Sequence, residues 1–302
     1  MPAAAKRKTS AKKTTRKAAP KRKAAARKGS SGNRPANKGS RGEWVLITGA
    51  SAGIGEALAG KFAEGGFDLV LAARSKDKLA KLGKKLADKH AIATEVAQID
   101  LSKPGAPRDL FNEMVSRGID IDVLVNNAGV LEMGAFKTQA PETLGDMIRL
   151  NTVALTELAA HFVPPMAERK SGRLLNVASV ASFQPVPSLA VYAGTKAFVL
   201  SLTESLAEEL KPDGVTVTAL CPGITETNMF GTIKSSNDRT ERIPSFLVGD
   251  VQEVAQEGYD ACIKGDVVRV PGLAYAMTTS IGRAAPRWLT RLVAGTIGRQ
   301  MM

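Results

Sequence analysis

The chain of 302 residues contains only two cysteines, Cys221 and Cys262, and only two histidines, His90 and His161. Two distant cysteines form neither a disulfide framework nor the paired spacing of a zinc site, and isolated histidines add no ligand set. We therefore expect no metal site and a reducing, cytoplasmic setting. No run of about eighteen apolar residues occurs, so no transmembrane helix is expected. The N-terminus lacks the apolar core of a secretory signal.

Acidic and aromatic residues are absent from residues 1–42, which hold fifteen of the 42 Lys and Arg residues. Such a segment cannot bury enough apolar surface to fold, so we expect a disordered basic tail. Its composition resembles the lysine-rich tails of linker-histone-type proteins. Three interpretations stay open: sequence-independent contact with nucleic acid or another polyanion, a nuclear or organellar targeting segment, or a tail without a partner.

Residues 43–302 are near neutral, with 27 basic and 29 acidic residues. Short, continuously apolar runs alternate there with segments whose apolar residues recur at helical spacing. Continuous apolar strands are typical of a parallel sheet covered by helices on both faces, so the sequence predicts an α/β fold, a single Rossmann-type doubly wound sheet over 43–272. Residues 273–302 are expected to form a basic amphipathic extension.

Seven strands and six helices are expected in this domain. Ser75 is expected to cap the second helix, and the long fourth helix is expected to bend or shorten near Pro164-Pro165. The expected strands are 44–48, 69–73, 94–99, 123–125, 173–177, 215–220 and 267–270. The expected helices are 53–64, one beginning after Ser75, 109–116, 143–168, 192–210 and 251–263.

The turn after the first expected strand, residues 48–55, reads Thr-Gly-Ala-Ser-Ala-Gly-Ile-Gly. Glycine permits a tight turn and a close approach of the backbone to a diphosphate, which then lies at the positive end of the next helix. The spacing is Gly-x-x-x-Gly-x-Gly. Between the first strand and the first helix of an alternating α/β chain, it predicts a dinucleotide site rather than an ordinary turn.

The end of the second expected strand indicates which dinucleotide binds. A carboxylate there would bind the ribose 2′-hydroxyl of NAD, but the chain has Arg74 instead, and Asp68 lies at the other end of the strand. The planar guanidinium of Arg74 can pair with a 2′-phosphate. We therefore expect NADP(H) in preference to NAD(H). The alternative is that Arg74 is a solvated loop residue.

Tyr192 and Lys196 are spaced one helical turn apart, and Ser179 lies thirteen residues before the tyrosine. If Tyr192 opens a helix, Lys196 lies on the same face, and its ammonium would lower the tyrosine pKa from about 10. Ser179, at the end of a strand, can hold a carbonyl or alcohol oxygen against the phenol. The pattern predicts proton transfer to oxygen, although a helix-surface Tyr-x-x-x-Lys pair is a common alternative.

Three motifs follow one another along residues 44–272: the glycine turn, Asn126-Asn127-Ala128-Gly129 after the fourth strand, and the Ser, Tyr and Lys set. In this order they resemble the short-chain dehydrogenase/reductase family. The resemblance implies an oxidoreductase that transfers a hydride between NADP(H) and a carbonyl or alcohol. It also implies a homodimer or homotetramer.

The resemblance further implies a role for each matching residue. Tyr192 would be the acid/base, Ser179 would bind the substrate oxygen, Lys196 would also hold the nicotinamide ribose, and Asn151 would hold a water that resupplies the proton. Pro222 and Gly223 would lie beside the nicotinamide, with Thr225 or Thr227 near its amide or the phosphates. The remaining expected cofactor contacts are Gly49, Ser51, Gly53, Ile54, Gly55, Arg74, Asp100, Asn126, Ala128 and Gly129.

The substrate cannot be identified from the sequence, but two segments bear on it. Residues 224–248 would close over the site, and their apolar residues favour either a lipophilic ketone or alcohol or simple packing of the segment onto the domain. The C-terminal extension mixes Trp288, Leu289 and Leu292 with arginines. It would pack on the domain or on another subunit, or contact a membrane surface.

Two functions of different classes fit the sequence. The first is an NADP-dependent ketone reductase or alcohol dehydrogenase. The alternative is a non-catalytic NADP-binding scaffold or sensor, tethered to nucleic acid by its tail. The full set of Asn151, Ser179, Tyr192 and Lys196 favours the enzyme, because a scaffold has no chemical need of all four. An enzyme that is also tethered to nucleic acid combines both.

Overall fold

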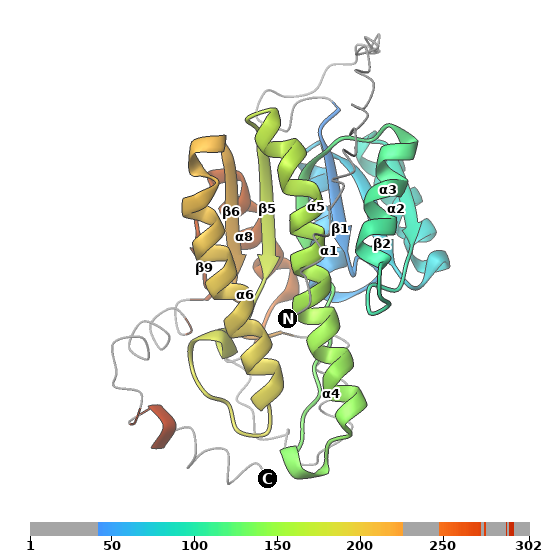
Figure 1. The fold of residues 1–302 in the computed structure, drawn as a ribbon. Helices are drawn as coiled ribbons and strands as arrows, with labels where there is room; N and C mark the ends of the chain where they lie inside the picture. Colours follow the sequence, from blue (N-terminus) through green and yellow to red (C-terminus); the bar gives the residue numbers. More distant parts are fainter. Residues whose placement is uncertain (1–41, 226–247, 273–274, 276–287, 289, 293–302) are drawn as a thin grey trace, which may run out of the picture. The chain divides into compact units, whose positions relative to one another are not determined.

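A computed structural model describes residues 42–225, 248–272, 275, 288 and 290–292. Its centre is a seven-stranded sheet in the order β3-β2-β1-β4-β5-β6-β9, with every neighbouring pair parallel (Figure 1). The strands are β1 (Trp44–Thr48), β2 (Asp68–Ala73), β3 (Thr94–Gln98), β4 (Ile121–Asn126), β5 (Gly172–Val177), β6 (Val215–Leu220) and β9 (Val268–Arg269). The short strands β7 (Ile224–Thr225) and β8 (Val248–Gly249) pair separately.

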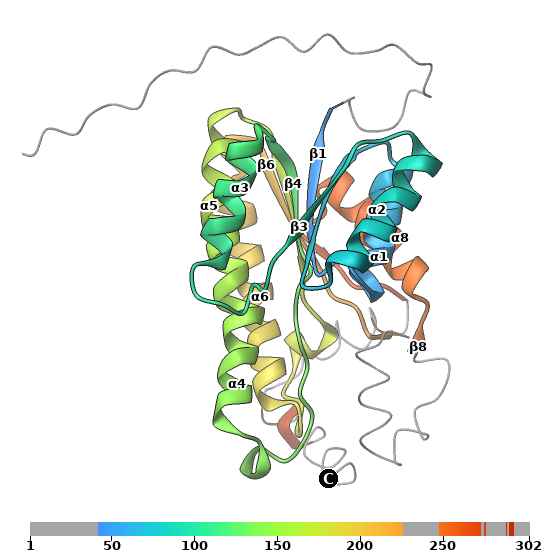
Figure 2. The same ribbon diagram turned by 90° about the vertical axis from the view of Figure 1, so that its right-hand side faces the viewer.

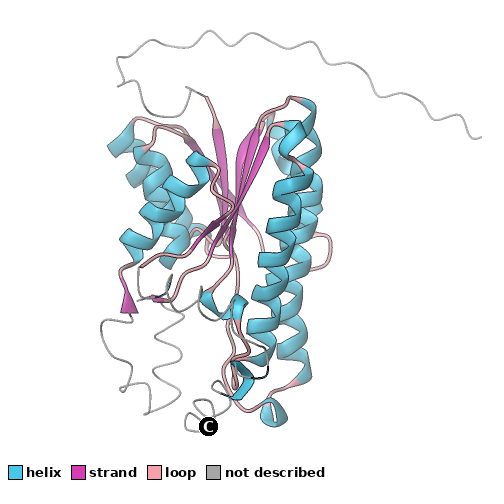
Figure 3. Ribbon diagram, turned by 90° about the vertical axis from the view of Figure 1, so that its left-hand side faces the viewer, coloured by secondary structure: helices cyan, strands magenta, loops and turns pink. Residues whose placement is uncertain are grey.

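Helices cover both faces of the sheet, as Figures 2 and 3 show. One layer contains α1 (Gly53–Glu64), α2 (Lys76–His90) and α8 (Val251–Lys264). The other contains α3 (Ala106–Arg117), α5 (Leu155–Glu168) and α6 (Ala190–Glu209), with α4 (Pro141–Ile148) leading into α5. The chain also forms the short 3-10 helices η1 (Phe136–Thr138), η3 (Val180–Phe183) and η4 (Lys211–Asp213). The predicted doubly wound α/β fold is confirmed.

The order of the strands fixes where a ligand can bind. From β1 the chain moves outward to β2 and β3, then returns to β4 on the other side of β1. Adjacent loops at the carboxyl ends of β1 and β4 therefore turn in opposite directions, and in open α/β sheets ligands bind at such a switch point. The glycine turn follows β1 at this edge, and the segment beginning with Asn127 follows β4.

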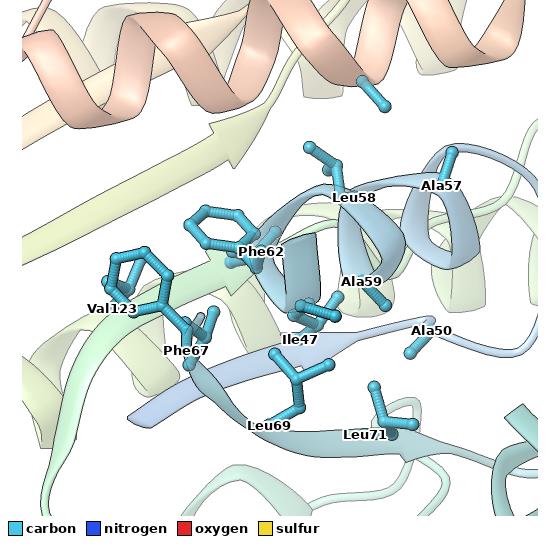
Figure 4. Close-up of a cluster of buried hydrophobic side chains, with 14 of the residues drawn as sticks. Ile47, Ala50, Ala57, Leu58, Ala59, Phe62, Phe67, Leu69, Leu71 and Val123 are labelled. Carbon is cyan, nitrogen blue, oxygen red and sulfur yellow. The ribbon is translucent and has the colours of Figure 1, made fainter. Parts of the chain in front are cut away.

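Two hydrophobic clusters hold the layers to the sheet. Under α1, α2 and α8, the Phe62 ring packs edge-on against Phe67, at a centroid distance of 5.5 Å (Figure 4). It also packs edge-on against Tyr259, at 5.1 Å. Under α3 and α5, Phe111 packs against Phe162 and stacks on the His161 ring at 5.4 Å. His161 is therefore a packed residue, as expected. Cys221 and Cys262 are buried.

Several boundaries differ from the sequence predictions. Most strands shift by one or two residues, and the predicted 143–168 helix is α4, a π-helical segment η2 (Arg149–Ala154) and α5 in succession. The predicted shortening at Pro164-Pro165 is wrong, since α5 runs through both prolines to Glu168. Ser75 is the N-cap residue of α2, but its side chain makes no capping hydrogen bond. Only its backbone carbonyl takes part, accepting from the Leu79 N–H. Within the described ranges, no helix is long and apolar enough to cross a membrane.

Candidate active site

The glycine turn is shaped by two residues in the left-handed region. Gly49 has φ +66° and Gly53 has φ +60°, a conformation that glycine adopts without strain. Helix α1 begins at Gly53, and its N-cap residue Ala52 has no side chain able to accept from the first-turn N–H groups. These N–H groups, with the positive end of the helix, fit an anionic diphosphate. The turn therefore has the features expected of a dinucleotide site.

Asn127 holds this turn in place through hydrogen bonds, a role that the sequence analysis did not assign to it. Its Nδ2 donates to the carbonyl oxygens of Thr48 and Gly49, at 2.9 and 3.3 Å. The same Nδ2 lies 2.8 Å from where a Cβ on Gly49 would stand, and a Cβ on Gly55 would overlap it. Gly49 and Gly55 are thus required for packing inside the turn. The Asn-Asn pair was the available signal, but only the first asparagine was given a role.

Thr48 joins the two loops at the switch point. Its Oγ1 accepts from the backbone N–H groups of Asn127 and Ala128, both at 3.0 Å, and donates to the carbonyl of Val125 at 3.2 Å. A buried hydroxyl therefore fixes the start of the Asn-Asn-Ala-Gly segment to the end of β1. The sequence analysis placed Thr48 at the end of the first strand and the start of the glycine turn, but gave its side chain no role. Ala128 is positioned through its backbone.

Arg74 and Asp100 lie close together at the ends of β2 and β3, where the adenosine end of a dinucleotide is expected. The Arg74 side chain is exposed, and its backbone carbonyl accepts from Gln98 Nε2 at 3.2 Å. The Ser102 hydroxyl donates to Asp100 Oδ1 at 2.7 Å and lowers the pKa of that carboxyl, with a smaller contribution from the Arg74 charge. Asp68 lies at the opposite end of β2, where its Oδ1 accepts from the Ala93 N–H.

Ser179 and Tyr192 meet at the carboxyl end of β5. Ser179 caps η3, where its Oγ accepts from the Ala181 N–H at 3.1 Å. Tyr192 is the third residue of α6 rather than its first, and its side chain is buried. Burial raises the pKa of Tyr192, and a side-chain hydrogen bond with Ser179 partly offsets that rise. The two hydroxyls predicted to act on one substrate oxygen are therefore in contact.

Lys196 is buried beside the tyrosine. Its Nζ lies 5.8 Å from the centre of the Tyr192 ring and donates to the Val177 carbonyl at 2.7 Å. Desolvation lowers the pKa of Lys196 from 10.5 to about 8. The expected lowering of the tyrosine pKa is wrong, because burial of the phenol raises that pKa and is the largest influence on it. The spatial relation of the pair is as predicted.

Asn151 lies in the π-helical segment η2, which the sequence did not indicate. Its Oδ1 accepts from the Val130 N–H and its Nδ2 donates to the Val130 carbonyl, both at 2.9 Å. A Cβ on Gly129 would stand 3.1 Å from Asn151 Oδ1 and 3.6 Å from Lys196 Nζ. Three segments far apart in the sequence therefore converge on Gly129. The four predicted catalytic residues lie in one region, at the ends of β4 and β5.

Asn126 links strands beneath this region. Its Nδ2 donates to Asn176 Oδ1 on β5, and Asn176 Nδ2 donates to Thr203 Oγ1 on α6, each at 3.0 Å. This buried chain of hydrogen bonds ties β4, β5 and α6 together. The Oδ1 of Asn126 has no hydrogen-bond partner among the described residues.

The other expected contacts are positioned as follows. Ser51 lies in the glycine turn, Ile54 packs against the core, and Pro222, Gly223 and buried Thr225 follow β6. Thr227 and the apolar residues expected within 226–247 lie outside the described residues. Trp288 and Leu292 expose 61% and 59% of their surface, so packing of these two side chains inside the domain is wrong. Contact with a subunit or a membrane stays a prediction.

A family profile described as short chain dehydrogenase matches residues 43–238. The chain belongs to the short-chain dehydrogenase/reductase family. The chain is 30% identical to the very-long-chain 3-oxoacyl-CoA reductase of Mus musculus over 82% of its own length and 77% of the relative. Members of the family are oxidoreductases that act on carbonyl or alcohol groups.

Two solved structures are similar to this chain in both sequence and fold. A short-chain dehydrogenase from Sphingobium yanoikuyae in complex with NADPH is 36% identical, with a TM-score of 0.71 over 80% of this chain and 93% of that one. The bulky-bulky ketone specific alcohol dehydrogenase from Comamonas testosteroni is 32% identical, with a TM-score of 0.69 over 80% and 91%.

Proposed function

We propose that this protein is an NADP(H)-dependent oxidoreductase that interconverts a lipophilic ketone and its alcohol, with Tyr192 as the acid/base. The observation that carries the proposal is the position of the Lys196 ammonium, 5.8 Å from the centre of the Tyr192 ring, with Ser179 near enough to the phenol to lower its pKa. A donor pair beside a buried cation suits an oxygen that gains negative charge during reduction.

Each side chain has a distinct task in this reaction. NADPH, when bound, supplies the hydride. Ser179 Oγ–H donates to the carbonyl oxygen and orients it. The Tyr192 hydroxyl gives its proton to that oxygen as charge develops, and the Lys196 ammonium stabilises the phenolate that remains. Asn151 holds the Val130 backbone beside Lys196 and supports the water through which the phenol regains its proton.

NADP(H) is preferred because of the charge at the end of β2. Arg74 presents an exposed guanidinium there, and the strand ends without a carboxylate that would bind a ribose 2′-hydroxyl. A guanidinium fork pairs well with a phosphate. Solved relatives in complex with NADPH or NADP support the same preference.

A lipophilic substrate is supported by the side chains around Tyr192. Leu144 and Met147 of α4 pack in one cluster with Tyr192, and apolar residues of the two adjoining loops pack against that cluster. The loop residues are Val130, Leu131, Val186 and Leu189, and Val191 of α6 packs with them. The names of two relatives point the same way, since one is a very-long-chain 3-oxoacyl-CoA reductase and another is specific for bulky-bulky ketones.

The test is turnover of Tyr192→Phe on a panel of ketones and 3-oxoacyl thioesters, followed by NADPH absorbance. We expect a loss of about 10²- to 10⁴-fold, the range that a general acid contributes, with NADPH affinity retained. Tyr259→Phe is the matched control, because it removes a phenol hydroxyl on α8, where the ring packs on Phe62. If wild type and Tyr192→Phe both bind NADPH and neither turns over any substrate, the scaffold hypothesis replaces the enzyme.

A second activity is proposed for residues 1–42, on the strength of their fifteen basic and no acidic residues. Such a segment binds polyanions by releasing their counterions, so the affinity falls steeply with salt. Deleting residues 1–41 should abolish salt-sensitive retention on DNA and leave turnover unchanged. Retention that survives the deletion would assign the binding to the folded domain instead.

Self-association is proposed from exposed apolar side chains on one helical layer. Val153 and Phe198 each expose 44% of their surface, and a second subunit would remove such side chains from water. Sedimentation of wild type against Phe198→Ser tests this, with a shift towards monomer expected in the variant.

A further inference from the structure

Tyr275, from the C-terminal extension, lies against the backbone that follows β6. A Cβ on Gly223 would overlap the Tyr275 ring, so the ring is seated directly on the Gly223 backbone. The Tyr275 hydroxyl oxygen accepts from the Ile224 N–H at 3.3 Å. One side chain therefore contacts two successive residues of the segment expected beside the nicotinamide.

The segment under Tyr275 is directly connected to the catalytic residues. The Pro222 carbonyl accepts from the Val180 N–H at 2.9 Å, next to Ser179. Two residues earlier, at the end of β6, the Leu220 carbonyl accepts from the Ala178 N–H at 2.7 Å. A shift of Pro222 or Gly223 would therefore move the Ser179 loop as well.

Ordinary sheet pairing fixes this segment on only part of its length. Cys221 is held by the Arg269 carbonyl, and Ile224–Thr225 pairs with Val248–Gly249 in the two-stranded β7-β8 ladder. Between these points Gly223 carries no side chain with which to pack. The Tyr275 ring occupies that position, and its hydroxyl takes up the Ile224 N–H.

We propose that Tyr275 is a positioning residue for the nicotinamide half of the cofactor site. Its ring and hydroxyl hold the Pro222–Thr225 backbone in the shape that accepts the nicotinamide. This inference rests on the proposed function, because it takes that backbone to lie beside the nicotinamide. It gives the C-terminal extension a defined part in cofactor binding, separate from any contact with a membrane or a subunit.

The test compares the affinity for NADPH with the affinity for a fragment that has only its adenosine half. NADPH reaches the Pro222–Thr225 segment, whereas adenosine 2′,5′-bisphosphate has no nicotinamide. We expect Tyr275→Ala to weaken NADPH binding by about tenfold, and Tyr275→Phe by about threefold, the size of one lost hydrogen bond. Binding of adenosine 2′,5′-bisphosphate should stay within twofold of wild type. Tyr259→Phe, whose ring packs on Phe62, should change neither affinity.

Gly223→Ala extends the test to the partner residue. Alone, the added methyl group collides with the Tyr275 ring, so NADPH affinity should fall at least as far as in Tyr275→Ala. Combined with Tyr275→Ala, the methyl group has room, so the second substitution should cost less than it does alone. Such non-additivity is the mark of two residues in contact.

Three outcomes would overturn the inference. Equal weakening of both ligands would show a general loss of structure, and a lower melting temperature with unchanged affinities would show a purely structural role. Tighter NADPH binding in Tyr275→Phe would show that the hydroxyl obstructs the site. These affinities decide the matter even if no substrate is turned over, so failure of the proposed reaction is recognised separately by an inactive wild type that still binds NADPH.

Discussion

The ammonium of Lys196 on α6 donates to the carbonyl oxygen of Val177 at the end of β5, at 2.7 Å. Both residues are buried, and desolvation brings the pKa of the ammonium down to about 8. The protein therefore keeps a cation next to Tyr192 at the expense of stability. A residue retained under such conditions is better explained by chemistry than by folding.

Lys196→Met should become relatively less favourable as the pH rises. Because burial lowers the pKa of Lys196 from 10.5 to about 8, the unfolded chain binds more protons than the folded one between these pH values. Wild-type stability therefore gains with pH across this window, whereas the variant has no such gain. Urea unfolding of both proteins at pH 7 and pH 10 should show a relative shift of about 3 kcal/mol at most. A difference that does not change with pH would contradict a buried, titrating ammonium.

Reduction should lose efficiency as Lys196 gives up its proton. Burial raises the pKa of Tyr192, so the phenol stays protonated while Lys196 titrates near pH 8. The neutral amine cannot stabilise the phenolate that remains after proton transfer. Since kcat/KM reports the free enzyme, its pH profile should fall above about pH 8 with the slope of one proton. A profile that is flat to pH 9.5 would show that Lys196 is not the group in control.

Sequence patterns predict the sheet and the glycine turn well, because each rests on local spacing. The catalytic roles of Asn151, Ser179, Tyr192 and Lys196 stay a prediction. The continuous apolar runs gave the strands to within one or two residues, and Tyr192 and Lys196 share a helix face as their spacing requires. Arg74 and Asp100 also lie at adjacent strand ends, as the alternation of strands and helices implies.

What escaped prediction depends on contacts between segments far apart in the sequence. Asn127 acts on Gly49 and Gly55 across more than seventy residues, and Tyr275 reaches Gly223 from the extension. The π-helical segment that carries Asn151 has no pattern of its own in the sequence. The predicted direction of the Tyr192 pKa was wrong for the same reason, since spacing shows a neighbouring charge but not how much water is lost on burial.

Gly55→Ala should disable the cofactor turn. The added Cβ has no room between Asn127 Nδ2 and the Gly49 carbonyl, so the variant must displace the asparagine that holds the turn. We expect a loss of about 1–3 kcal/mol in the free energy of unfolding, as for overpacking, and at least a tenfold weaker affinity for NADPH. Fluorescence titration and urea unfolding measure the two effects.

The control for this variant is Gly60→Ala in the same helix. No atom lies within 4 Å of a Cβ built on Gly60, so alanine fits and should stabilise the helix by about 0.5–1 kcal/mol through its higher helix propensity. NADPH affinity should not change. Equal losses at Gly55 and Gly60 would mean that α1 tolerates no alanine, and the argument from Asn127 would be lost.

Arg74→Ala should reduce discrimination between the two cofactors. The guanidinium would pair with the 2′-phosphate, and a charge-assisted contact of about 1.5–3 kcal/mol corresponds to roughly 10- to 100-fold in affinity. The dissociation constant for NADPH should rise by that factor, while that for NADH stays unchanged. Arg108→Ala on α3 removes an equal charge from an exposed pair with Asp109 and should alter neither constant. A parallel loss for NADPH and NADH would show that Arg74 acts on the adenosine they share, most directly through Asp100, whose carboxyl pKa its charge helps to lower.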